Sequence, residues 1–330
     1  MKRVLLLLAA GLLVAAPLVF AGGAREAAGP ETLTFAHLGS AETAYHQGAE
    51  RFAERLEALS DGRFTVEIFP DGQMGDEDEL FEQQMAGALD FSVVNPGKIV
   101  EFSRTANIFM FPFMWRDIDH WNAVLGGDLG LEISERIYDE SGVKVIGYFG
   151  GGVRNVVSRV PLSGIEDLDG LTLRTNQTQP EIPAWRALGA DPVPYAYNEI
   201  YTGLQTGAID GLLNESEWVE IMSFHEVAPY IGLSQHEITV RFVTMSGQTW
   251  ERLSQADRAL VQQAADDAAE FARELQLAVD LEALDRIQEE GATLVEFDKE
   301  RMQDIVRDPV LEVGRQLGLD DLYQRVQQAR

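Results

Sequence analysis

The sequence of 330 residues contains no cysteine, and basic residues are scarce, since 26 Lys and Arg stand against 54 Asp and Glu. The missing cysteines exclude disulfide bonds, thiolate metal sites and cysteine nucleophiles, and they leave both reducing and oxidising compartments open. The formal net charge at pH 7 is -28. A surface this acidic repels nucleic-acid phosphates and anionic membrane faces, so we expect neither as a partner.

Motifs of common catalytic sites are also missing. The segments that begin at His225 and His236 start like the helix of a zinc peptidase, but neither contains the second histidine, so no metal site is expected. The glycine-rich run 147–155 has Asn155 where a dinucleotide-binding loop needs its last glycine, and neither a P-loop nor a GxSxG motif occurs. We therefore expect a protein that is not an enzyme and needs no cofactor or metal.

The only long apolar run without charges lies at the N-terminus, where two basic residues precede the stretch 4–20. This pattern predicts a secretory signal peptide over residues 1–21, cleaved after Ala21, and a Gly/Ala/Glu linker over 22–30. The alternative is an uncleaved membrane anchor, for which the run is slightly short because a span needs about 20 apolar residues. We expect an acidic, exported protein in the periplasm.

The rest of the chain alternates between strand-like and helix-like segments. Phe52, Leu56 and Leu59 share one helical face, whereas Phe64, Val66 and Ile68 alternate as in a strand. This alternation predicts α/β layers with a mainly parallel sheet, and the length suits two domains of about 150 residues each. The segments with clear patterns are strands at 32–39, 63–69, 90–95, 143–149, 171–175, 209–214 and 237–246, and helices at 44–59, 76–89, 119–140, 180–190, 198–208 and 216–225.

One very long helix is predicted from Ser254 to Glu290. This segment has no Gly or Pro, opens with Ser254 and Asp257 as a capping box, and stops at Gly291. At 1.5 Å per residue it would extend for about 55 Å, which is enough to lie across two domains.

Two arginines stand at positions suited to an anion site. Arg174 ends an apolar, strand-like run, and open α/β sheets bind their ligands at the carboxyl ends of strands. Arg154 follows a run of glycines. A guanidinium group is always charged and pairs with a carboxylate through two parallel hydrogen bonds. In a chain this acidic, the competing interpretation is that each arginine pairs with an Asp or Glu at the surface.

The run GIEDLDGLTLRT at 164–175, the run 185–211 and the Asn214 that follows closely resemble the substrate-binding proteins of tripartite ATP-independent periplasmic (TRAP) transporters, of the C4-dicarboxylate-binding type. The similarity covers nearly the whole mature chain, including GQMGDEDELFEQQMAGALDF at 72–91 and FPFMWRDIDHW at 111–121.

The resemblance implies a two-domain periplasmic-binding-protein fold of the α/β class, with the long helix spanning both domains. The domains would close over an organic acid anion and deliver it to the membrane subunits of a TRAP permease. We expect residues 31–151 plus 240–279 to form domain I, residues 152–239 plus 280–330 to form domain II, and the protein to be a monomer.

The resemblance also implies roles for single residues. Arg174, in LDGLTLR, matches the arginine that clamps the ligand carboxylate, and Arg154, in GGVRN, matches a second frequent ligand contact. Asn214 matches a neutral partner of the carboxylate. Tyr197, three residues after Pro194, matches an aromatic ring placed against the ligand, although core packing is the alternative for this side chain.

His37 and Asn95 end two strand segments at positions that often face the cleft in this family. Each has an alternative role, His37 as a satisfied histidine of the cleft wall and Asn95 as a turn residue before Pro96. Sialic-acid binders of the family carry an acidic residue where Asn95 stands, which argues against that ligand.

The side chains of this predicted site favour a hydroxylated monocarboxylate. Two arginines supply positive charge, and the neutral polar groups around them suit hydroxyls rather than an amine. We expect a hexuronate such as glucuronate or galacturonate first and a C4-dicarboxylate second. A secreted enzyme that acts on a sugar acid and a ligand-sensing subunit are the alternative functions.

Overall fold

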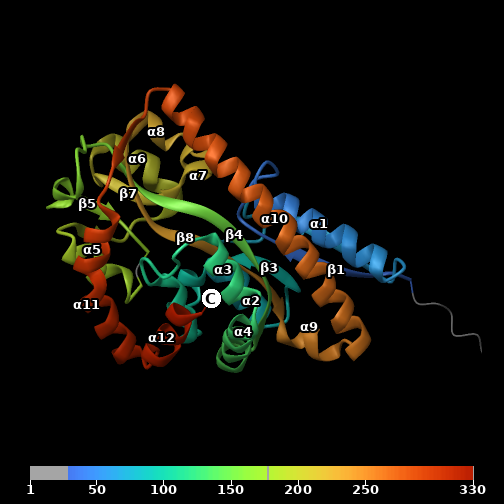
Figure 1. The fold of residues 1–330 in the computed structure, drawn as a ribbon. Coiled ribbons are helices and arrows are strands. Elements are labelled where there is room, and N and C mark those ends of the chain that lie inside the picture. The colour runs from blue at the N-terminus through green and yellow to red at the C-terminus, as the bar shows by residue number, and fades with distance from the viewer. Residues whose placement is uncertain (1–28, 177, 330) are drawn as a thin grey trace, which may run out of the picture.

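A computed structural model describes residues 29–176 and 178–329 (Figure 1). The predicted signal peptide and its cleavage site after Ala21 lie outside the described residues, as does the linker up to residue 28. Within the described ranges, no helix combines the length and the apolar character that crossing a bilayer requires.

A single mixed sheet runs through the described part of the molecule, with the strand order β2-β1-β3-β8-β4-β7-β5-β6 and with β9 paired to β8. The strands are β1 Glu31–Ala36, β2 Phe64–Phe69, β3 Phe91–Val94, β4 Val143–Ser158, β5 Thr172–Arg174, β6 Asp191–Val193, β7 Gly211–Glu215, β8 Tyr230–Ser246 and β9 Thr293–Glu296. The prediction of a mainly parallel sheet is wrong at the centre, because β8 is antiparallel to β3 and β4 is antiparallel to both β7 and β8.

The long strands β4 and β8 join two lobes of the sheet. The first part of β4 pairs with the last part of β8 beside β1 to β3, and the second part of β4 pairs with β7 beside β5 and β6. The register shifts between Gly150 and Val153. Gly150 has a φ of 110°, and a Cβ there would lie 2.4 Å from the Thr239 carbonyl oxygen. Only glycine fits this crossing without strain.

The predicted long helix is confirmed as α10, Gln255–Glu289, which is 35 residues long and is capped by the Ser254 side chain. It packs against α1 (Ala44–Leu59), β4 and α7 (Ser216–Ile221), and so lies along both lobes (Figure 1). Buried alanines, among them Ala265, Ala268 and Ala272, allow the close approach.

The predicted helix at 119–140 is instead two helices, α3 (Ile118–Leu125) and α4 (Asp128–Ser141), because Gly126 and Gly127 interrupt it. A Cβ at Gly127 would lie 2.7 Å from the Ala123 carbonyl oxygen. The remaining helices are α2 Glu77–Met85, α5 Glu181–Ala187, α6 Ile200–Thr206, α8 Phe224–Val227, α9 Gly247–Arg252, α11 Lys299–Leu317 and α12 Asp320–Gln328.

Candidate ligand-binding cleft

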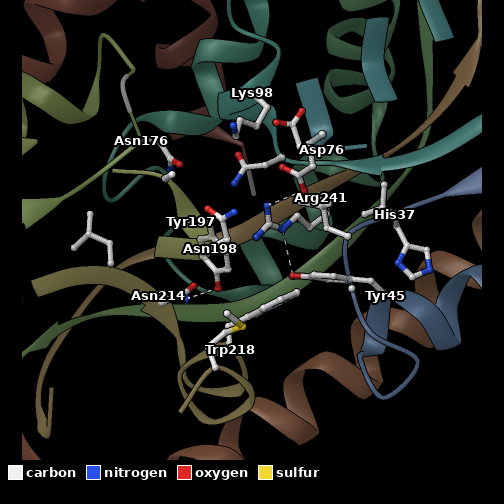
Figure 2. A pocket seen from close by; sticks show the side chains of 18 of the residues that line it. His37, Tyr45, Asp76, Lys98, Asn176, Tyr197, Asn198, Asn214, Trp218 and Arg241 are labelled. Carbon is white, nitrogen blue, oxygen red and sulfur yellow. Dashed lines mark hydrogen bonds and ion pairs between the residues drawn. The ribbon is translucent and has the colours of Figure 1, made fainter. Parts of the chain in front are cut away.

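A cavity of about 440 Å³ lies between the two lobes (Figure 2). Side chains from α1, α2 and the last part of β8 line it on one side, and side chains from β5, β7, α7 and the segment after β6 line it on the other. It brings together all six side chains predicted from the sequence: His37, Asn95, Arg154, Arg174, Tyr197 and Asn214. Their role as ligand contacts is taken up as a proposal below.

Arg174 is the last residue of β5, and few groups of the described chain interact with its guanidinium group. Its Nε donates to the Tyr195 carbonyl oxygen at 3.2 Å, and its Cζ lies 5.7 Å from the centre of the Tyr197 ring. Among the described residues, no carboxylate lies within ion-pair distance of it. Burial and the neighbouring Arg154 lower the pKa of Arg174. Glu181 opposes this shift from beyond ion-pair distance, and a ligand anion would compensate the positive charge further.

Arg154, by contrast, is already paired. It is 4% exposed, its Nε lies 3.2 Å from Glu215 Oε2, and its Nη1 lies 3.1 Å from Glu237 Oε2. Burial alone would lower the pKa of Arg154, but Glu237 and Glu215 raise it. The two carboxylates neutralise much of its field, so Arg154 attracts a ligand anion less strongly than Arg174 does.

Tyr197 and Asn214 form a polar pair on the same wall. Asn214 Nδ2 donates to the Tyr197 hydroxyl at 3.0 Å, and Asn214 Oδ1 accepts from the Glu215 backbone N–H at 3.2 Å. The Tyr197 ring also packs edge-on against Trp218 and Phe224. Burial raises the pKa of Tyr197 to about 12. Tyr197 therefore both lines the cavity and packs against the core behind it.

His37 and Asn95 lie on the opposite wall. His37 is 1% exposed, and its Nε2 lies 3.2 Å from His46 Nδ1. Burial and His46 lower the pKa of His37 to about 4, so its ring is neutral at physiological pH. Asn95 Oδ1 accepts from the Gly97 backbone N–H at 2.7 Å, which is the turn role named as the alternative.

The sequence interpretation missed several charged and aromatic side chains of the cavity, above all Glu77, Lys98 and Arg241. Arg241 Nε donates to the Tyr45 hydroxyl at 3.3 Å, and Lys98 Nζ lies 2.9 Å from Asp78 Oδ2. The one available signal was Arg241 itself, the single charged residue in the stretch 238–246 of β8, because an arginine is rarely buried in a strand unless it has a partner. Glu77 and Lys98 carry no such signal.

A two-lobed α/β fold with a polar cleft between its lobes defines the class of two-domain binding proteins. Within that class the chain belongs to the bacterial extracellular solute-binding proteins of family 7, whose family model matches residues 35–309. The resemblance to TRAP substrate-binding proteins, and the fold expected from it, are confirmed.

Individual relatives agree over nearly the whole chain. A solute-binding protein of Roseobacter denitrificans is 33% identical over 280 residues, which are 85% of this chain and 86% of its own. A TRAP periplasmic solute-binding protein of Sulfitobacter sp., solved with bound α-D-taluronate, has a TM-score of 0.85 and 31% identity over 90% of this chain and 97% of that chain. A TRAP periplasmic protein of Pseudomonas putida, solved with bound D-glucuronate, has a TM-score of 0.85 and 27% identity over 91% of this chain and 98% of that chain.

Proposed function

We propose that this protein is a periplasmic receptor that binds a sugar acid, with hexuronates as the first candidates, and delivers it unchanged to a TRAP membrane permease. The observation that carries the proposal is the guanidinium of Arg174 on the wall of the cleft between the lobes, which has no ion-pair partner among the described residues. The taluronate and glucuronate bound by two relatives of similar fold support the choice of ligand class.

Arg174 binds the ligand carboxylate through its planar fork. Its Nε is held by the Tyr195 carbonyl oxygen, which fixes the orientation of the guanidinium group before a ligand arrives. Asn214 and the Tyr197 hydroxyl supply neutral hydrogen-bonding groups nearby, and the Tyr197 ring covers the carbon skeleton. Arg154, held by Glu215 and Glu237, shapes the floor beneath this site and contacts the ligand as a second donor.

The two lobes close over the ligand as domain I (31–151 plus 240–279) and domain II (152–239 plus 280–330). The hinge lies where β4 and β8 cross, near Gly150 and Thr239. Tyr45 of α1 and Trp218 of α7 both line the cavity, and their rings pack against each other with 5.9 Å between ring centres, so the two lobes touch at this point. Ligand contacts on both lobes favour the closed arrangement by their differential affinity.

A panel of organic acids tests the function. At a concentration 100 times its dissociation constant, a ligand stabilises the fold by about 2.7 kcal/mol, which a melting assay resolves. We expect stabilisation by glucuronate and galacturonate, weaker stabilisation by succinate and malate, and none by uncharged hexoses. Recovery of the ligand unchanged after incubation separates a receptor from a secreted sugar-acid enzyme. Stabilisation by uncharged hexoses with no response to any carboxylate contradicts the proposal.

Export and the transport partner are part of the same proposal. N-terminal sequencing of the periplasmic form is expected to start at Gly22, after removal of the signal peptide. The receptor acts as a monomer with the small and large membrane subunits of the permease. Uptake of uronate into vesicles that contain those subunits, dependent on added protein, distinguishes transport from a ligand-sensing role.

A further inference from the structure

A second polar pair lines the cleft on the wall that belongs to α2 and β8. Glu77, the first residue of α2, and Arg241, on β8, approach to 3.8 Å between Oε1 and Nη1, and their side chains are 12% and 11% exposed. That separation exceeds a hydrogen bond, so the two groups attract each other without being bonded. Figure 2 shows Arg241 and Asp76, the residue before Glu77, on one side of the cavity, with Asn176 and Asn214 on the other.

Within the described residues, Arg241 leaves most of its donors unused, and Glu77 interacts with the backbone N–H of Asn95 but makes no hydrogen bond to another side chain. A guanidinium has five N–H donors, and the hydrogen bond that Arg241 makes within the described residues uses one of them, from Nε to the Tyr45 hydroxyl. Glu215 Oε1 lies 3.7 Å from Nη2, which is again too long for a hydrogen bond. Burial raises the pKa of Glu77, although Arg241 and Lys98 oppose the shift. Because this buried carboxylate and guanidinium lie close together without a hydrogen bond between them, a ligand that forms hydrogen bonds to both is favoured.

A hydroxyl group fits the gap between them best. It donates to a carboxylate and accepts from a guanidinium at the same time, and the net charge of the pair is zero. A second ligand carboxylate has no proton to donate to Glu77 and would meet a like charge. The nearby Lys98 offers it little attraction, because its ammonium is paired with Asp78 at 2.9 Å. An apolar ligand end would cover both groups and leave them without partners.

Resting on the proposed sugar-acid function, we propose that Glu77 and Arg241 recognise the ligand hydroxyls and select polyhydroxylated monocarboxylates over dicarboxylates and deoxygenated acids. The carboxylate of the ligand is held by Arg174 of domain II, and its hydroxyls are held by the pair from domain I. Hydroxyl recognition therefore contributes to closure of the lobes as well as to selectivity.

The proposal is tested by a cycle that combines a protein variant with a ligand change. Dissociation constants for galacturonate and for each of its monodeoxy analogues are measured by calorimetry with wild type and with Glu77→Ala. A hydrogen bond to a charged group corresponds to about tenfold or more in affinity. In the wild type, loss of at least one hydroxyl is expected to weaken binding at least tenfold. In Glu77→Ala the same loss is expected to cost less than threefold.

Glu82→Gln is the matched control, because Glu82 lies on the exposed face of the same helix and the variant removes the same charge. For each monodeoxy analogue, Glu82→Gln is expected to lose affinity relative to galacturonate by the same factor as the wild type does. Glu77→Gln keeps the shape of the side chain and serves as a second variant in case Glu77→Ala does not fold. It is expected to narrow the preference for galacturonate over succinate at least tenfold.

The outcomes separate this inference from the function on which it rests. If the wild type binds galacturonate in an Arg174-dependent way, but every hydroxyl costs the same in wild type and in Glu77→Ala, then hydroxyl recognition by this pair is wrong and the receptor function stands. An unchanged preference in Glu77→Gln overturns the selectivity in the same way. A wild type that responds to no carboxylate overturns both.

Discussion

The carboxylate of Glu217, in the first turn of α7, accepts a hydrogen bond from the backbone N–H of Ala44, the first residue of α1, at 3.4 Å. Gln276 of α10 donates to the other carboxylate oxygen of Glu217 at 2.6 Å. Asp280, one turn further along α10, accepts from the backbone N–H groups of Glu217 and Val153. Through Glu217, these contacts join the proposed domain II to Ala44 and Gln276 of the proposed domain I, and Asp280 holds β4 just beyond the crossing.

The buried position of Glu217 predicts a pH-dependent stability. Burial raises its pKa to about 7 from an ordinary value of 4.5. Between these two values the folded state binds more protons than the unfolded state, so the free energy of unfolding falls as pH rises through the window. We expect the stability of wild type relative to Glu217→Gln to decrease from pH 5 to pH 7, by at most about 1.4 kcal/mol per pH unit, and to level off above pH 8. Urea unfolding across this range measures it.

An exposed carboxylate serves as the control for this measurement. Glu54→Gln, which removes an exposed carboxylate on the outer face of α1, is measured in parallel. A difference between wild type and Glu217→Gln that stays constant with pH would contradict the assignment. Asp280, whose pKa burial raises to about 6, acts in the same direction at slightly lower pH.

Replacing Arg174 by Ala is expected to weaken hexuronate binding by about two orders of magnitude or more. Two charge-assisted hydrogen bonds are lost, each corresponding to about 1.5 to 3 kcal/mol. Arg174→Lys should not restore binding, because it keeps the charge and loses the two-point geometry. Arg186→Ala, an exposed arginine on α5, is the control. Near wild-type affinity for Arg174→Ala in calorimetry would remove this residue from the site.

Ligand binding is expected to make the protein more compact. Small-angle scattering should show a smaller radius of gyration with saturating galacturonate than without it, because contacts on both lobes favour closure. Arg174→Ala at the same ligand concentration should keep the unliganded radius. If saturating ligand leaves the wild-type radius unchanged, closure about a hinge is wrong.

The crossing of β4 and β8 depends on glycine. Gly150→Ala is expected to lower the free energy of unfolding by more than about 1 kcal/mol, because it adds strain at a φ of 110° and places a Cβ against the Thr239 carbonyl. Gly62→Ala is the comparison, since Gly62 also has a positive φ but no atom lies near its added Cβ. Equal losses for the two variants would show that the close approach at Gly150 has no effect.

Local sequence patterns determined much of the fold. The Ser254 cap, a run without Gly or Pro and the stop at Gly291 predicted α10 almost to the residue, because these signals act within one helix. The strand pattern likewise placed Arg174 at the carboxyl end of β5, where it lines the cavity. Two predictions were wrong for different reasons. The helix expected at 119–140 is broken at Gly126 and Gly127, which is a local signal that was missed. The centre of the sheet is antiparallel because β4 pairs with strands that lie far along the chain.

Only the tertiary structure decided which cations of the site are free. The sequence shows Arg154 and Arg174 as equals, 20 positions apart, but strand pairing places Glu215 directly opposite Arg154 and Glu237 beside it on β8. Arg174 has no such neighbour in the described chain. Glu77 and Arg241 are 164 positions apart and meet only because α2 and β8 border the same cavity. Electrostatic compensation depends on distance in space, so the sequence alone determines where a charge stands along the chain, and the fold determines whether it is satisfied.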